Sequence, residues 1–276
     1  MNTLEAHRFA HRKPWAFSAL VVVAAGGLDL ILKPAADLLS LRLPVITIGI
    51  ISGAVVATIG ALVVGQLGLW RQLGLLGRPA RPLALLWFLP FAIYGLLPLT
   101  VGIEITPGRG AGALAFGVLI AFWKLVVLGL ILYAWLPRGP RTAAVATALF
   151  WGGMHIGGLL AGAPLVPTLL LALSYCLLGF AFVAVRFRVG LLWPLIACYA
   201  LLLTTAAAMQ TGDASNLADS VTAVLPAVGS SIVLAGYGLL AWPRRWQAAE
   251  RDAVARPAEP TAIAQAAADS PAGHHG

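Results

Sequence analysis

Residues 143–163 read AAVATALFWGGMHIGGLLAGA, an apolar run with one ionisable side chain, His155. The run is long enough to cross a bilayer as a helix, since crossing takes about 20 residues. A membrane helix would surround His155 with hydrocarbon, and a buried polar group without a partner is costly. The partner of His155 is therefore the first question that the sequence poses.

The composition extends this interpretation beyond one segment. Of the 276 residues, 60% are hydrophobic and 10% are charged, whereas soluble domains carry about 25% charged residues. The mean hydropathy is +0.91. Cys176 and Cys198 lie in apolar runs and lack CxxC spacing, so neither a thiolate zinc site nor a disulfide framework is expected. This is the composition of a polytopic membrane protein.

Eight apolar runs approach the length of about 20 residues that a bilayer requires. They cover residues 15–31, 44–67, 82–103, 111–136, 143–163, 167–185, 189–209 and 221–242. We therefore expect an all-α fold, a polytopic membrane helix bundle of about eight transmembrane helices within residues 15–246. Residues 1–14 are expected to form a cytoplasmic N-terminal segment. Residues 247–276 are rich in alanine and proline, and a disordered cytoplasmic tail is expected there.

The distribution of basic residues supports the count of eight helices. If the N-terminus is cytoplasmic, fourteen basic residues fall in cytoplasmic segments and three in outer segments, as the positive-inside rule predicts. The fourteen are Arg8, Arg12, Lys13, Arg71, Arg78, Arg81, Arg138, Arg141, Arg186, Arg188, Arg244, Arg245, Arg251 and Arg256. We therefore expect a multi-pass plasma-membrane protein with both termini cytoplasmic. The net charge of +8 is interpreted as this topology signal and as attraction to anionic membrane lipid, and nucleic acid is not an expected partner.

Three polar side chains are expected near the middle of the membrane: Lys124, His155 and Tyr199. Each lies about 10–12 residues from the cytoplasmic end of its run, and a rise of about 1.5 Å per residue places it some 15–20 Å deep. Asp29 and Glu104 lie nearer the outer face. Lys124 either snorkels along its own helix or faces the bundle interior. His155 either is hydrogen-bonded within the bundle or binds something.

Four glycines surround His155: Gly152, Gly153, Gly157 and Gly158. Small residues in membrane helices allow another helix to approach closely, so close packing is expected along this stretch. The sequence contains neither an H-E-x-x-H zinc motif nor a G-x-S-x-G nucleophile motif. A metal held by His155 alone would lack the three protein ligands of a catalytic zinc site.

Two motifs include these residues. WGGMH at 151–155 places an aromatic residue four positions before a histidine, and RFRVGLLWPLIACYA at 186–200 places Gly-x-Leu-Trp ahead of Tyr199. On these motifs, residues 122–203 resemble the CPBP family, the CAAX-prenyl-protease and bacteriocin-processing intramembrane proteins, also called Abi proteins. Members of that family carry Glu-Glu-x-x-x-Arg, Phe-x-x-x-His and His-x-x-x-Asn/Asp on consecutive core helices. The resemblance implies a core at about residues 111–209.

The resemblance implies roles for the mid-membrane residues. In the family, the glutamate and the histidines serve metal-assisted or water-activating hydrolysis of a peptide bond within the membrane. Here His155 retains the histidine of the second motif, Tyr199 stands at the histidine position of the third, and Lys124 stands at a glutamate position. These three residues are therefore the motif-equivalent catalytic positions. Without the glutamates, the general base and the carboxylate metal ligand are missing.

Three functions remain open, and with them the question of whether the chain is an enzyme. The first is a non-catalytic pseudoprotease that needs no cofactor and binds or regulates a peptide, a lipid or a partner transmembrane helix. The second is an active CAAX-type endopeptidase with altered residues, using zinc or another divalent metal. The third is a small-molecule or lipid transporter in which Lys124 attracts an anionic group. Lys124 is expected either to supply a fixed positive charge or to form a hydrogen-bonded cluster with His155 and Tyr199.

Overall fold

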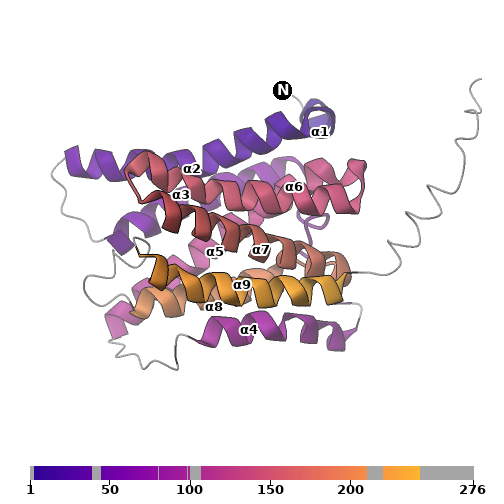
Figure 1. Ribbon diagram of the computed structural model, residues 1–276. Helices are drawn as coiled ribbons and strands as arrows, with labels where there is room; N and C mark the ends of the chain where they lie inside the picture. Colours follow the sequence, from indigo (N-terminus) through magenta and orange to yellow (C-terminus); the bar gives the residue numbers. More distant parts are fainter. Residues whose placement is uncertain are drawn as a thin grey trace, which may run out of the picture. The chain divides into compact units, whose positions relative to one another are not determined.

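Backbone polar groups find no water in a bilayer, so apolar runs of this length fold into helices that satisfy their own hydrogen bonds. The computed structural model describes residues 3–38, 45–79, 81–97, 99, 107–209 and 220–242, and its regular elements within these ranges are all helical. Figure 1 shows these helices lying side by side. They belong to one unit, Met1–Trp242. The expected tail at 247–276 lies outside the described residues.

The helices follow the eight predicted runs, each of which holds one of the helices α2 to α9. In chain order the structure contains α1 (Thr3–Arg12), α2 (Pro14–Leu38), α3 (Val45–Gln66), η1 (Pro82–Phe88), α4 (Leu89–Leu96), α5 (Pro107–Trp135), η3 (Leu136–Arg138), α6 (Pro140–Gly153), η4 (Met154–Ala161), α7 (Leu165–Val189), α8 (Trp193–Met209) and α9 (Val221–Ala241), where η denotes a 3-10 helix. Helix α1 precedes the first run and was not expected from the apolar pattern.

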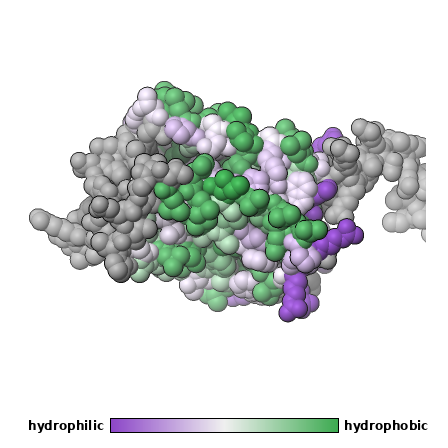
Figure 2. Space-filling view, turned by 90° about the horizontal axis from the view of Figure 1, so that it is seen from below, coloured by the Kyte–Doolittle hydropathy of each residue, from purple (hydrophilic) through white to green (hydrophobic). Residues whose placement is uncertain are grey.

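The described helices have the lengths and the apolar character of membrane spans. Five stretches are long and apolar enough to cross a membrane: Ile46–Gln66, Gly110–Arg138, Pro140–Leu160, Leu165–Val189 and Val224–Ala241. Three shorter apolar helices, at Pro14–Gly27, Pro82–Leu96 and Trp193–Ala208, occupy the other predicted runs. Figure 2 shows a largely hydrophobic middle, with hydrophilic side chains gathered toward one end. The predicted all-α membrane bundle is confirmed, and the chain is a multi-pass membrane protein.

Helix α5 lies at the centre of the bundle and packs against α8, α3, α6 and α2. Its side chains Leu125, Leu128 and Ile131 are fully buried. Close packing on α8 depends on Gly117, because a Cβ there would lie 2.7 Å from the carbonyl oxygen of Ala200. A side chain on α5 at this depth is therefore placed rigidly against its neighbours.

The fifth predicted run does not continue as a single α-helix. Helix α6 ends at Gly153, and the chain continues as the 3-10 helix η4, which stops at Gly162 with φ 84°. Glycine is a poor helix former, and 3-10 turns are frequent where an α-helix ends. The change of helix type falls one residue before His155, so it determines where the imidazole points.

Candidate functional site

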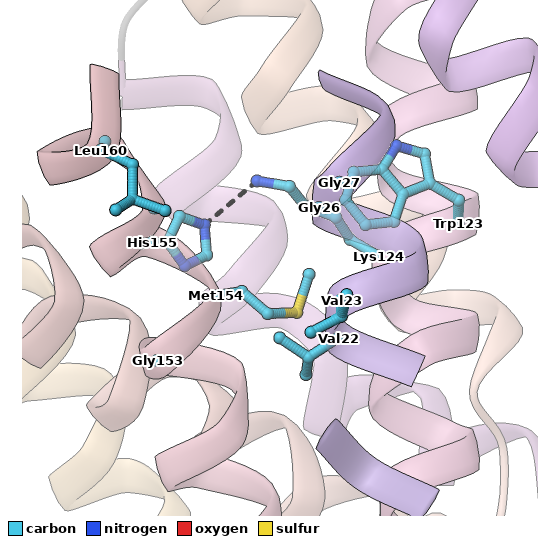
Figure 3. Close-up of a pocket in the computed structure, with 12 residues that line it drawn as sticks. Val22, Val23, Gly26, Gly27, Trp123, Lys124, Gly153, Met154, His155 and Leu160 are labelled. Atoms are coloured by element: carbon cyan, nitrogen blue, oxygen red, sulfur yellow. Dashed lines mark hydrogen bonds between the residues drawn. The ribbon is translucent and has the colours of Figure 1, made fainter. Parts of the chain in front are cut away.

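Lys124 and His155 meet within the bundle although they lie on different helices. Lys124 projects from the middle of α5, and His155 projects from the start of η4. The Lys124 Nζ atom lies 3.1 Å from the His155 Nε2 atom, as Figure 3 shows. The structure therefore selects an inward-facing lysine over one that snorkels to the membrane surface.

The second ring nitrogen of His155 fixes the direction of this hydrogen bond. The His155 Nδ1 atom lies 3.0 Å from the carbonyl oxygen of Trp151, an acceptor that the end of α6 leaves available. A carbonyl oxygen only accepts, so Nδ1 carries the proton and donates it. In the neutral imidazole, Nε2 is then the acceptor, and Lys124 donates to it. Both nitrogens of His155 are engaged.

Aromatic rings enclose the pair. The imidazole of His155 stacks on the ring of Tyr175, with centroids 3.4 Å apart and planes 10° from parallel. The Lys124 Nζ atom lies 5.2 Å from the centroid of Tyr175 and 5.8 Å from that of Trp123. Aromatic faces attract an ammonium group. The rings therefore favour a positive charge on Lys124.

Tyr199 forms no direct hydrogen bond with this pair, so the three-residue cluster stays a prediction in its third member. The Tyr199 hydroxyl is buried and adjoins the hydroxyl of Tyr175, whose ring stacks on His155. The ring of Trp151 contacts both residues, with centroid distances of 6.2 Å to Tyr199 and 6.4 Å to His155. Helix α8 thus directs Tyr199 into the aromatic core behind Trp151. The structure brings together two of the three motif-equivalent residues.

A cavity of about 570 Å³ lies beside the Lys124–His155 pair. Its walls come from α2, α5, the end of α6, and η4: Val22, Val23, Gly26, Gly27, Trp123, Lys124, Gly153, Met154, His155, Gly157, Gly158 and Leu160. Val23 is 67% exposed and Leu160 is 82% exposed, so the cavity reaches the outer surface of the bundle. Between membrane helices, that surface faces lipid.

The glycines around His155 perform two different tasks. Only Gly152 matches the expected close packing in full, since a Cβ there would collide with Cys176 Sγ and lie 2.5 Å from the carbonyl oxygen of Ala172 on α7. A Cβ at Gly153 or Gly157 would meet nothing within 4 Å, and both residues line the cavity. For these two, the expectation of close packing is wrong. They leave space for the cavity.

The resemblance implies a divalent metal, but the donor atoms at this site do not suit one. Catalytic zinc needs three protein ligands, and no group of three His, Cys, Asp or Glu residues comes together among the described residues. The available lone pair of His155 faces the ammonium of Lys124, and a positive charge there repels a metal dication. Glu104 lies outside the described residues.

No protein-family model, curated protein or solved structure matches this chain. The family resemblance therefore depends on the motif residues alone.

The sequence reasoning also missed two residues of the site, Tyr175 and Trp123. Tyr175 carried a usable signal, because it is a polar aromatic residue in the middle of an apolar run. Trp123 had one as well, as the neighbour of the intramembrane lysine.

Proposed function

We propose that this chain is a CPBP-like, non-catalytic membrane protein that binds a ligand in the cavity beside Lys124 and His155. The observation that carries the proposal is the engagement of both nitrogens of His155, Nδ1 by Trp151 and Nε2 by Lys124. A general base or a metal ligand needs an available nitrogen lone pair. The lysine occupies the lone pair on which catalysis by this histidine would depend.

The motif register supports the same proposal. Lys124 and His155 stand at motif positions where the resembled family holds a glutamate and a histidine, and these two side chains are in contact at 3.1 Å. A lysine at the glutamate position reverses the charge beside the imidazole. An ammonium group neither accepts a proton from water nor binds a dication. Two side chains thus stand together at the family's catalytic positions, but they lack the general base and the metal ligand that hydrolysis needs. The cavity beside them remains available for binding.

The proposal predicts that the purified protein lacks both metal and peptidase activity. We expect less than stoichiometric zinc, and no turnover of prenylated or transmembrane peptides above that of His155→Ala, because Nε2 is already occupied. Elemental analysis and a cleavage assay on the full chain in lipid nanodiscs measure the two quantities. Stoichiometric zinc, or turnover that His155→Ala abolishes, would establish the altered endopeptidase instead.

We further propose that both termini face the cytoplasm across the plasma membrane. The proposal is supported by the fourteen-to-three division of basic residues. A fluorescent protein fused after residue 276 should fluoresce, and alkaline phosphatase at the same position should be inactive. The opposite pair of results would reverse the orientation. Phosphatase fused after residue 110 is the matched control and should be active.

A further inference from the structure

We infer, on the basis of the proposed binding function, that the ligand of the cavity is a long-chain fatty acid whose carboxylate pairs with Lys124. An ammonium group has three N–H donors, and the described residues supply one hydrogen-bond acceptor, His155 Nε2. Two N–H groups therefore face the cavity region without a protein acceptor in the described part of the chain.

The charge of Lys124 also lacks a protein counterion in that part. Glu5 is the only carboxylate among the described side chains, and it belongs to α1 and does not line the cavity. An unpaired charge in the membrane interior is expensive, whereas a paired charge gains strength from the low dielectric. One monovalent oxyanion would supply both the missing acceptors and the missing charge.

The rest of the cavity suits an acyl chain. Val22, Val23, Met154 and Leu160 are apolar, and the glycines add no polar side chain. In Figure 3, Val22, Val23 and Met154 gather on one side of the pair, and Leu160 lies next to His155. A volume of about 570 Å³ falls within the usual range for small-molecule sites. The exposed Val23 and Leu160 mark an entrance through which a chain can arrive from the bilayer.

The depth of Lys124 in the membrane favours a ligand with a small headgroup. Lys124 lies fourteen residues before Arg138, which ends the apolar stretch on the side proposed to be cytoplasmic, so its Cα is about 20 Å deep at 1.5 Å per residue. A polyol or phosphodiester headgroup would have to bury several further polar groups at that depth, each at a cost. A carboxylate brings only two oxygen atoms, which match the two remaining N–H groups of Lys124.

Discrimination between ligands should come from the headgroup and not from the chain. An acyl chain gains little on moving from lipid into the cavity, because both surroundings are apolar. Loss of one partner from a buried charge pair lowers affinity by about 30-fold or more. The neutral methyl ester of the same chain is therefore the sharpest comparison.

The test is saturable binding of tritiated palmitic acid to the full chain in nanodiscs, with competition by methyl palmitate. We expect one palmitate per chain, and competition by the ester that is weaker by about 30-fold or more. Lys124→Met should lower palmitate affinity by a similar factor, and Gly157→Leu should abolish binding by filling the cavity. Gly236→Leu is the matched control, since it also points into open space but lies on α9 away from the cavity.

Equal competition by the ester, or unchanged affinity in Lys124→Met, would overturn the inference. Asp29→Asn is included because Asp29 follows the cavity residue Gly27 by two positions and its side chain is not described. Palmitate binding that occurs only in Asp29→Asn would identify Asp29 as the counterion of Lys124 and overturn the inference for the native chain. None of these failures concerns the proposed non-catalytic function, which the metal and cleavage measurements decide separately.

Discussion

Replacing Gly152 with alanine is expected to destabilise the folded bundle by about 2–3 kcal/mol, the cost of overpacking a filled interior. The added Cβ would collide with Cys176 Sγ and lie 2.5 Å from the carbonyl oxygen of Ala172. The carbonyl belongs to the backbone of α7 and cannot rotate away, so α6 and α7 must separate. Their contact supports Trp151, whose carbonyl oxygen holds the imidazole of His155.

Gly153→Ala is the matched control for this effect. The two glycines are adjacent in α6, but a Cβ at residue 153 meets nothing within 4 Å. Alanine is the better helix former by up to about 1 kcal/mol, so this variant should be as stable as the native chain or more stable. Chemical unfolding in detergent micelles measures both free energies. Equal stabilities for the two variants would contradict the described packing of α6 on α7.

The second large effect is expected from His155→Leu. This substitution leaves the Trp151 carbonyl without its donor and the Lys124 ammonium without its described acceptor, at a cost of about 1.5–3 kcal/mol for the lost hydrogen bond to a charged group. Lys124→Met removes the charge itself, so the double variant should be more stable than the sum of the single effects predicts. We expect a coupling free energy of about 1–3 kcal/mol between the two positions.

Ser231→Ala provides the control for this coupling. Ser231 is fully buried and shares a hydrogen bond of 2.7 Å with Ser174, between α7 and α9. It has no described contact with Lys124, so Lys124→Met and Ser231→Ala should be additive within about 0.5 kcal/mol. Unfolding free energies of the single and double variants supply both cycles. Additivity in the Lys124–His155 cycle would mean that the two side chains do not interact in the membrane.

The fold could be predicted from the sequence to the level of its helices, because the length and polarity of each apolar run report directly on membrane insertion. The break between α6 and η4 could not be predicted. Glycines at 152, 153, 157 and 158 are compatible with a continuous packed helix and with a 3-10 segment that borders a cavity. Which of these forms depends on where α2 and α7 lie, and that is tertiary information.

The site was predictable in part for a similar reason. Lys124 and His155 lie at similar depths in consecutive runs, and both carry polar atoms that lipid cannot satisfy. Each therefore needs a polar partner in the bundle, and a contact between them could be expected. Tyr199 lies at a similar depth, but its direction depends on the rotation of α8 against Trp151. A tyrosine ring is also apolar enough to pack in an aromatic core. Depth alone therefore does not decide whether Tyr199 reaches Lys124 and His155 directly or only through Tyr175.

In the proposed function, Lys124 donates a hydrogen bond to the Nε2 lone pair of His155. His155 therefore cannot act as a base or a metal ligand, and the site binds a ligand without catalysis. Magic-angle-spinning NMR of the chain in lipid, with 15N-labelled lysine and histidine, tests this hydrogen bond directly, since the sequence holds only three lysines and five histidines. We predict a protonated Nδ1 and an unprotonated Nε2 in His155, with a dipolar contact between Nε2 and Lys124 Nζ that matches 3.1 Å and disappears in Lys124→Met. A His155 Nε2 signal that shows metal coordination, or that is unchanged by Lys124→Met, would contradict the claim.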